Sequence, residues 1–432
     1  MKTLFTILLT LVFATSLTAR IGTRFPSERK VVTDPVTGVD LVFLTSKPAG
    51  DSKIYPTHAQ WTADGKWVIF RSNRVPGEAM AVNEESGDIV QVTEGGYTGQ
   101  LCIAQKSMKL YIMRDPNREI GAGRDVPYGD MEVVAIDLAK LFADSAAGTL
   151  QDKSHYETVC GAVPAGMGAR GDMDLDANED LVYFRLGSEY AARHLPGDVE
   201  VVEDYGPRNM GAGPGGIARM DLESGEVSLV TVVGFQVGHV QSSRYVPGQV
   251  VFCWETGGKS PQRTWIVNGD GTGLRPLYKE SSFEWVTHEA VTGPNEVTFA
   301  ILGHRRPGQV DEWGECGSRD KPTGLAIINT ETGLMKIEGQ TDEGSGFWHV
   351  HASSDGRFAC GDDFSRSLYL IDRRTGEKMM LTTGHKPTAR DHVHPTFSED
   401  GTRIQFQSAM LSEDDRSMNI CVVHVPREWL DR

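Results

Sequence analysis

The chain has 432 residues, of which 39% are hydrophobic and 24% charged, and its formal net charge is −16. This length and composition predict a globular protein with a sizeable core. The negative charge argues against a nucleic-acid surface, because a polyanion is bound by a broad basic patch. A small anionic ligand stays compatible with this charge wherever arginines gather locally.

Residues 1–19 have the pattern of a secretory signal, with Lys2, a short apolar run and small residues up to Ala19. We therefore expect cleavage after Ala19 and a secreted, periplasmic protein. The apolar run is shorter than the roughly 20 residues of a helical membrane span, and no later segment reaches that length. We expect residues 20–432 to form a single domain with no membrane span.

One pattern recurs from residue 55 to the C-terminus: a short strand, a turn rich in Gly, Asp or Asn, further strands and a second turn. Several strands per unit and regular turns of this kind are typical of propeller blades. The sequence therefore predicts an all-β fold, a seven-bladed β-propeller with blades of the TolB/WD40 kind. The first turn of the unit occurs seven times, at Asp64, Ser107, Asn178, Gly248, Asn295, Asp355 and Asp400.

Three segments stand outside the blade pattern. Residues 29–44 are rich in β-formers, and we expect them to pair with the last blade, because closing the ring removes open sheet edges. Residues 137–143 have the pattern of a helix inserted between blades. Residues 206–216 contain so many glycines that we expect an ordered loop rather than a strand.

The six cysteines are scattered through separate repeats, without the paired spacing of a metal site. We expect mostly buried, apolar thiols. An oxidising compartment leaves room for one disulfide. The cysteines are Cys102, Cys160, Cys253, Cys316, Cys360 and Cys421.

Four histidines share one register relative to the first turn of a repeat. His58, His349 and His394 each lie six residues before the turn aspartate, and His288 lies six before Pro294. Because the first strand of each blade lines the axis of a propeller, these side chains should converge at one end of the ring.

Two of these histidines belong to pairs spaced by two residues, His349 with His351 and His394 with His392. Alternation along a strand places both members of a pair on one face. Two such pairs, together with His288 and His58 in matching register, predict a site for a divalent transition metal. The alternative is that these histidines are structural or exposed to solvent.

The segments Gly238-His239-Val240, Thr287-His288-Glu289 and His392-Val393-His394 resemble, in order and spacing, those of the oligogalacturonate lyases. These enzymes of pectin breakdown are seven-bladed propellers. The resemblance implies that His239 is the catalytic base. It also implies a manganese site whose ligands are His288, His392 and His394.

The chain departs from the family at two positions. The family's fourth metal ligand is a glutamine, and Ala389 stands there, so His349, His351 or water is expected to replace it. A family arginine is matched by Gly216. We expect Arg263 to supply the catalytic cation instead, with Arg244 as a second candidate.

The expected function is metal-dependent cleavage of short uronic-acid oligosaccharides, such as oligogalacturonides, by β-elimination. The reaction removes a weakly acidic proton next to a carboxylate, so a metal and an arginine would stabilise the developing charge while a neutral histidine takes the proton. We expect His58, Arg244, His349 and His351 to contact the acidic substrate. Two alternatives remain: a lyase for another acidic glycan, and a non-catalytic periplasmic propeller that binds a protein or glycan.

Overall fold

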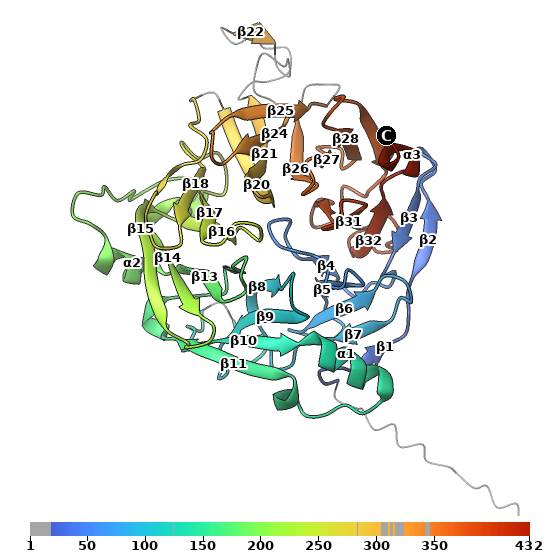
Figure 1. The fold of residues 1–432 in the computed structure, drawn as a ribbon, viewed down its shortest axis with the longest axis horizontal. Helices are drawn as coiled ribbons and strands as arrows, with labels where there is room; N and C mark the ends of the chain where they lie inside the picture. The colour runs from blue at the N-terminus through green and yellow to red at the C-terminus, as the bar shows by residue number, and fades with distance from the viewer. Residues whose placement is uncertain are drawn as a thin grey trace, which may run out of the picture.

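The described residues form a ring of seven antiparallel sheets around a common axis, a seven-bladed β-propeller as predicted (Figure 1). The computed structural model describes residues 19–123, 125–282, 284–303, 310–311, 314–315, 324–341 and 346–432. The expected signal segment lies outside these residues, apart from Ala19. No described helix is long and apolar enough to cross a membrane.

The strands of each blade follow one another from the axis of the ring outward. Blade 1 contains β4 (Ser52–Lys53), β5 (Trp67–Arg71), β6 (Ala79–Asn83), β7 (Ile89–Gln91) and β1 (Arg24–Phe25). Blade 2 contains β8 (Thr98–Ile103), β9 (Lys109–Arg114), β10 (Met131–Asp137) and β11 (Glu157–Val163). Blade 3 contains β12 (Met173–Leu175), β13 (Leu181–Leu186), β14 (Ala212–Asp221) and β15 (Val227–Phe235). Blade 4 contains β16 (Val237–Ser242), β17 (Gln249–Trp254), β18 (Thr264–Asn268) and β19 (Arg275–Pro276).

The other blades have the same order. Blade 5 contains β20 (Glu284–Gly293), β21 (Glu296–Gly303), β24 (Gly324–Asn329) and β25 (Met335–Gly339). Blade 6 contains β26 (Phe347–Ala352), β27 (Phe358–Asp363), β28 (Leu368–Asp372) and β29 (Lys378–Thr382). Blade 7 contains β30 (Thr396–Phe397), β31 (Arg403–Ser408), β32 (Asn419–His424), β3 (Asp40–Phe43) and β2 (Lys30–Thr33). A separate hairpin pairs β22 (Val310–Asp311) with β23 (Gly314–Glu315).

All seven predicted turns join the innermost strand of a blade to the next strand outward. In blade 7, for example, the Asp400 carboxylate accepts hydrogen bonds from the backbone and hydroxyl of Thr402. We call the end of the ring that carries these turns the turn face. The opposite end, where the innermost strands begin, is the entry face.

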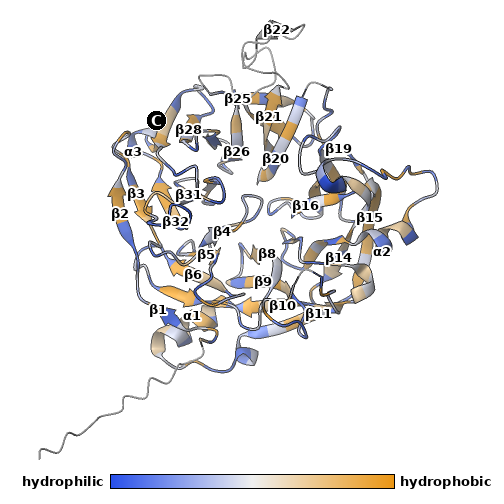
Figure 2. Cartoon of the chain, turned by 180° about the vertical axis from the view of Figure 1, so that it is seen from behind, coloured by the Kyte–Doolittle hydropathy of each residue, from blue (hydrophilic) through white to orange (hydrophobic). Residues whose placement is uncertain are grey.

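Seven apolar cores hold the ring together, one between each pair of neighbouring blades. Strand β3 shows how alternation builds them. Leu41 and Phe43 pack toward blade 6, whereas Val42 and Leu44 pack toward blade 1. Both faces of each sheet are therefore buried, and the hydrophobic residues follow the strands while the loops are polar (Figure 2).

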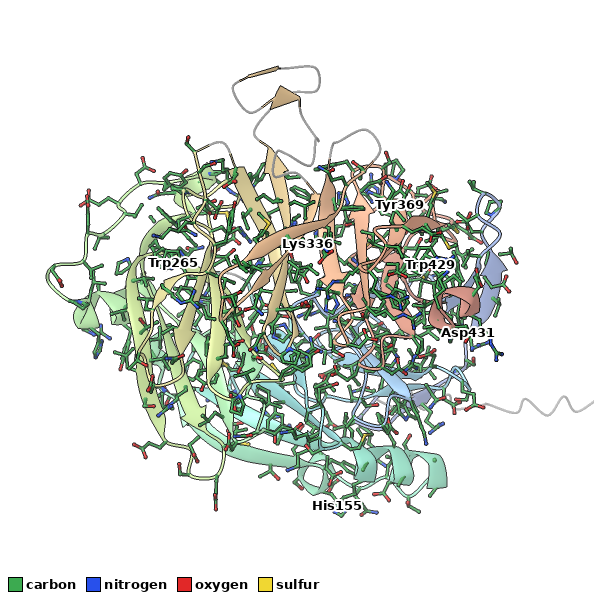
Figure 3. All side chains as sticks on the ribbon, turned by 45° about the horizontal axis from the view of Figure 1, so that its top comes forward. His155, Trp265, Lys336, Tyr369, Trp429 and Asp431 are labelled. Atoms are coloured by element: carbon green, nitrogen blue, oxygen red, sulfur yellow. The ribbon has the colours of Figure 1, made fainter. Side chains whose placement is uncertain are left out.

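The N-terminal segment closes the ring as predicted. Strand β3 pairs with β32, so that Val42 lies opposite Val422 and the outer half of blade 7 comes from the start of the chain. The C-terminal helix α3 (Arg427–Leu430) lies against the same region (Figure 3). Its Trp429 is buried, with its ring 6.4 Å from that of Phe358.

The predicted helix is α1 (Leu138–Ala147), which follows β10. Asp137 caps it by accepting from the backbone of Lys140, and Phe142 stacks on Trp67 with ring centres 4.1 Å apart. The structure also contains α2 (Ser188–His194) and 3₁₀ turns at Lys153–His155, Ala165–Met167 and Pro207–Asn209.

The prediction of a loop over residues 206–216 is wrong in part, because β14 begins at Ala212. The glycines serve close backbone packing there. A Cβ at Gly213 would lie 2.2 Å from the Gly234 carbonyl oxygen, and one at Gly215 would lie 2.7 Å from that of Phe235. Glycine at these positions therefore lets neighbouring strands approach.

The described cysteines are free thiols, and most are buried as predicted. Four are buried and Cys160 is partly exposed. Burial raises the pKa of the Cys253 and Cys360 thiols well above the usual value, so these side chains stay neutral. Cys316 lies outside the described residues.

Candidate active site

Three of the predicted site histidines have strained backbone conformations. The φ angles of His239, His288 and His394 are 49°, 55° and 53°. In β16 and β20 the histidine lies at a bulge in the strand pairing. Non-glycine residues rarely adopt positive φ, and such strain clusters at functional sites. The bulges re-aim these imidazoles toward the axis at the entry face.

His349 lies at the centre of a cluster of four imidazoles. Its ring centre is 3.8 Å from that of His394, 4.1 Å from that of His288 and 5.5 Å from that of His392. The predicted ligands His288, His392 and His394 therefore come together around His349. The predicted convergence holds for the three histidines of blades 5, 6 and 7.

Hydrogen bonds orient this cluster from behind. Asp362, fully buried at the end of β27, lies 3.2 Å from Nδ1 of both His349 and His392. The Nδ1 of His288 lies 2.6 Å from the Trp348 carbonyl oxygen. Each contact fixes a tautomer in which Nδ1 carries the proton, which leaves the three Nε2 atoms free as ligands.

The electrostatics of the cluster suit a metal. Burial, reinforced by the neighbouring histidines, lowers the pKa of His349 to about 4 and that of His288 well below its usual value. Neutral imidazole is the form that binds a transition metal. Burial opposes ionisation of Asp362, but His349 and His392 hold the pKa of this carboxyl well below its usual range. The donor set fits a divalent transition metal.

His394 has a different partner. Its Nε2 lies 3.2 Å from the carboxylate of Asp391, and its Nδ1 lies 3.4 Å from the side-chain amide of Gln407. Asp391 is half exposed and follows Ala389 by two residues. A carboxylate oxygen is therefore present beside the position where the family has its glutamine. Ala389 itself is buried.

His239, unlike the histidines of the cluster, lies among carboxylates. Its Nδ1 lies 3.1 Å from the buried carboxylate of Glu289, and its Nε2 lies 3.5 Å from Glu255. Burial alone would lower the pKa of His239, but the hydrogen bond and charge of Glu289 outweigh it and raise the pKa above 6.5. The side chain of His239 is 27% exposed, so a ligand can reach it.

Arg263 lies behind His239. Its Nε is 2.8 Å from Glu289, its Nη2 is 3.7 Å from Glu255, and its side chain is only 4% exposed. Burial opposes ionisation of Glu289, but the charges of Arg263 and His239 hold the pKa of Glu289 at about 2. Arg263 thus fixes the Glu289 carboxylate, which orients His239. The charge of Arg263 is already shared between two neighbouring carboxylates, Glu289 and Glu255.

Tyr55 is the site residue that sequence reasoning missed. Its ring centre is 5.1 Å from that of His239, 5.3 Å from that of His394 and 6.4 Å from that of His349. Burial raises the pKa of the phenol well above 10, so it stays protonated. Tyr55 therefore places a neutral proton donor between His239 and the imidazole cluster.

His58 does not join the cluster, so its predicted convergence is wrong. Strand β4 ends at Lys53, and pairing with β5 resumes only at Gln60, whose carbonyl accepts from Ile69. The residues between leave the sheet and shift the register. The Nε2 of His58 is 2.9 Å from the Met173 carbonyl oxygen in blade 3.

His351 and Arg244 also lie away from the cluster. The ring of His351 is buried beside Phe397, whose backbone N–H donates to its Nδ1. The bulge in β26 between Phe347 and Val350 breaks the alternation that would have aligned His351 with His349. Arg244 lines a small cavity toward the turn face together with His58.

A side chain at Gly216, the position of the family arginine, would crowd its neighbours. A Cβ at Gly216 would lie 3.0 Å from the carbonyl oxygen of Thr231 and 3.2 Å from Leu186. In the pairing of β13 with β14, Gly216 lies opposite Leu186, whereas Arg185, one residue earlier on β13, lies opposite Ile217 and on the other face of the sheet.

Comparison with known proteins shows the same scaffold. No protein-family model and no curated protein matches this sequence. Among solved structures, an oligogalacturonate lyase in complex with manganese superposes with a TM-score of 0.71 at 18% identity, covering 95% of this chain and 100% of that chain. An oligogalacturonate lyase from Vibrio parahaemolyticus superposes with a TM-score of 0.68 at 18% identity and the same coverage. The chain therefore shares the propeller fold of these two lyases over nearly its whole length.

Proposed function

We propose that this protein is a divergent relative of the oligogalacturonate lyases, a metal-dependent lyase that cleaves short uronic-acid oligosaccharides by β-elimination. One observation carries the proposal. An accessible histidine oriented by a buried carboxylate, His239 on Glu289, lies beside a cluster of imidazoles on a scaffold that superposes on a lyase in complex with manganese.

The proposed metal ligands are the Nε2 atoms of His288, His349 and His392, together with His394. His349 takes the place of the family glutamine because its ring contacts those of the other three. Bound manganese would supply positive charge for the substrate carboxylate, which makes the adjacent proton more acidic.

His239 is the proposed base. It takes the proton from the carbon next to the carboxylate, and the electron pair of that bond forms the new carbon–carbon double bond as the glycosidic carbon–oxygen bond breaks. The phenol of Tyr55 donates a proton to the leaving oxygen. Glu289 stabilises the imidazolium that His239 becomes, and Arg263 holds Glu289 in place.

The substrate is proposed as an acidic glycan, with oligogalacturonides as the first candidates. Gly216 and Ala389 differ from the family pattern, and these differences favour a related uronide as the runner-up substrate. The N-terminal pattern leads us to propose a secreted, periplasmic location, where such oligosaccharides are met.

The test is a continuous ultraviolet assay of the unsaturated product, with purified protein, oligogalacturonides and other acidic oligosaccharides, each with manganese and with chelator. A manganese-dependent rise in absorbance with at least one uronide supports the proposal. A flat trace with every acidic glycan, from folded and metal-loaded protein, would overturn it in favour of a non-catalytic propeller.

A further inference from the structure

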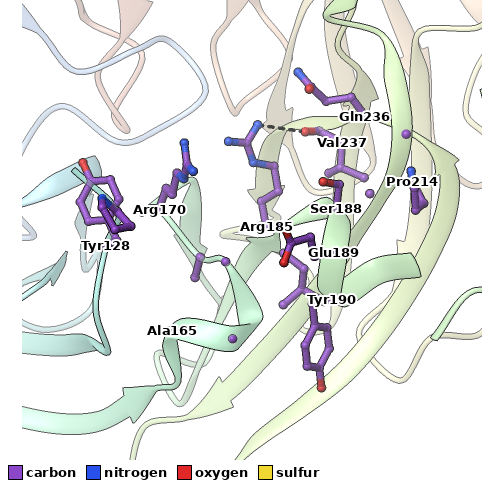
Figure 4. Close-up of a pocket in the computed structure, with 18 of the residues that line it drawn as sticks. Tyr128, Ala165, Arg170, Arg185, Ser188, Glu189, Tyr190, Pro214, Gln236 and Val237 are labelled. Atoms are coloured by element: carbon purple, nitrogen blue, oxygen red, sulfur yellow. Dashed lines mark hydrogen bonds between the residues drawn. The ribbon is translucent and has the colours of Figure 1, made fainter. Parts of the chain in front are cut away.

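A cavity on the entry face near His239 has no role in the chemistry described above. It has a volume of about 600 Å³, within the range of small-molecule sites, and lies among segments of blades 2, 3 and 4 and the connections between these blades (Figure 4). Its lining includes Tyr128, Arg170, Arg185, Tyr190 and Gln236.

Two arginines point the same way from the wall of this cavity (Figure 4). The Nη1 of Arg185 donates to the Val237 carbonyl at 3.2 Å, and its Nε lies 3.8 Å from Asp172, with the side chain 31% exposed. Arg170 is exposed, and within the described part of the chain it has no side-chain hydrogen bond or ion pair. Its guanidinium lies 5.9 Å from the centre of the Tyr128 ring.

The two guanidiniums retain donors for an anion. The net charge of the chain is −16, so two arginines in one cavity form a local positive patch. Among the described residues that line the cavity, the exposed Glu189 is the only one with a negative charge. Guanidinium groups bind carboxylates through charge-assisted, often paired hydrogen bonds. Tyr128, whose ring lies beside Arg170, adds aromatic surface to the lining, whereas the ring of Tyr190 is stacked on His194.

The cavity is close to the proposed base. Gln236 and Val237 line it at the start of β16, and His239 follows two residues later on the same strand. Two residues of strand span about 7 Å. A ligand in the cavity would therefore lie next to a sugar unit that reacts at His239.

We propose that this cavity is a subsite for a second acidic sugar unit of the same oligosaccharide, with Arg170 and Arg185 binding its carboxylate. This inference rests on the proposed function and adds a specificity that the histidine cluster alone does not give. The enzyme would select chains with at least two adjacent uronates, and the neighbouring uronate would position the reacting one.

Calorimetric binding in the His239→Ala background tests the subsite without turnover. The ligands are a short oligogalacturonide and its methyl ester, which lacks the negative charges. The variants are Arg170→Ala, Arg185→Ala and the pair together, with Arg416→Ala as a control that removes the same charge from an exposed arginine of blade 7.

We expect each cavity variant to raise the Kd of the acidic ligand about tenfold or more, as the loss of a charge-assisted hydrogen bond implies. Arg416→Ala should leave it unchanged. The methyl ester, which has lost its negative charges, should bind more weakly than the acid, and its Kd should be insensitive to the two cavity substitutions. Equal affinity of the cavity variants and the control would overturn the subsite while leaving the elimination intact.

The two proposals fail separately in this design. Arginine-dependent binding with no elimination by the wild-type enzyme would retain the subsite and overturn the lyase. Absence of any binding of the acidic oligosaccharide to folded, metal-loaded protein would overturn the subsite together with the galacturonide assignment.

Discussion

His239 and His349 both contact the ring of Tyr55, yet their surroundings shift their pKa values in opposite directions. His239 meets the carboxylates of Glu255 and Glu289, which raise its pKa despite burial. His349 is packed among other imidazoles, and burial with their charges lowers its pKa to about 4. One residue type thus suits the two proposed tasks: taking up a proton at His239 and binding a metal at His349.

Of the changes predicted here, removal of the metal should lower the rate of elimination most. We expect chelation to reduce elimination to the background rate and added manganese to restore it, because the imidazole cluster would then lack its cation. The far-ultraviolet circular dichroism spectrum should not change, since seven apolar cores hold the ring together. Full activity in chelator would contradict the role given to the imidazole cluster.

Tyr55→Phe removes the hydroxyl and keeps the ring that packs between the two regions. We expect kcat to fall about 10²-fold, the lower range for loss of a proton donor, with little change in KM or manganese affinity. Steady-state kinetics with a substrate that carries a more acidic leaving alcohol gives the control. With that substrate, the kcat of Tyr55→Phe should fall less. An equal fall in kcat for both substrates would show that the hydroxyl acts only in packing.

Asp362→Asn should weaken metal binding by the imidazole cluster and leave the surroundings of His239 unchanged. Because Asp362 orients both His349 and His392, we expect manganese affinity to fall about 10- to 100-fold, measured by calorimetry. Asp363→Asn is the matched control, since this neighbouring carboxylate accepts from Ser367 and Tyr369 instead. Equal losses in the two variants would indicate a general effect of charge.

The smallest predicted effect is on the pH dependence of kcat/KM. Since His239 must be neutral to take a proton and Glu289 raises its pKa, kcat/KM should decline as the pH falls through a value above 6.5. Glu289→Gln removes the charge that stabilises the imidazolium, so the acid limb should move to lower pH by about one unit. A shift to higher pH, or no shift, would show that Glu289 does not control His239.

The fold was predictable from local signals, whereas parts of the site were not. The carboxylates of turn residues such as Asp64 and Asp400 accept hydrogen bonds from the backbone two residues later, a local contact, so the repeat pattern located the blades correctly. The register of His58 failed because the chain leaves β4 after Lys53 and returns only at Gln60, an excursion without a signature in the sequence.

Tyr55 lies on that same excursion, and a single tyrosine in an irregular segment has no periodicity to mark it. Arg185 was hidden for another reason. It reaches the entry face at the end of the second strand of blade 3, and only the folded structure shows that it lines the same cavity as Arg170. Contacts between strands far apart in sequence decide both cases.

The most direct test of the central claim measures elimination and bound manganese on the same sample of His239→Ala. We predict a rate at least about 10²-fold below that of the wild-type protein, with an unchanged manganese content, because His239 belongs to the proton-transfer side of the site. A variant that binds manganese normally and still eliminates at the wild-type rate would contradict the assignment of His239 as the base.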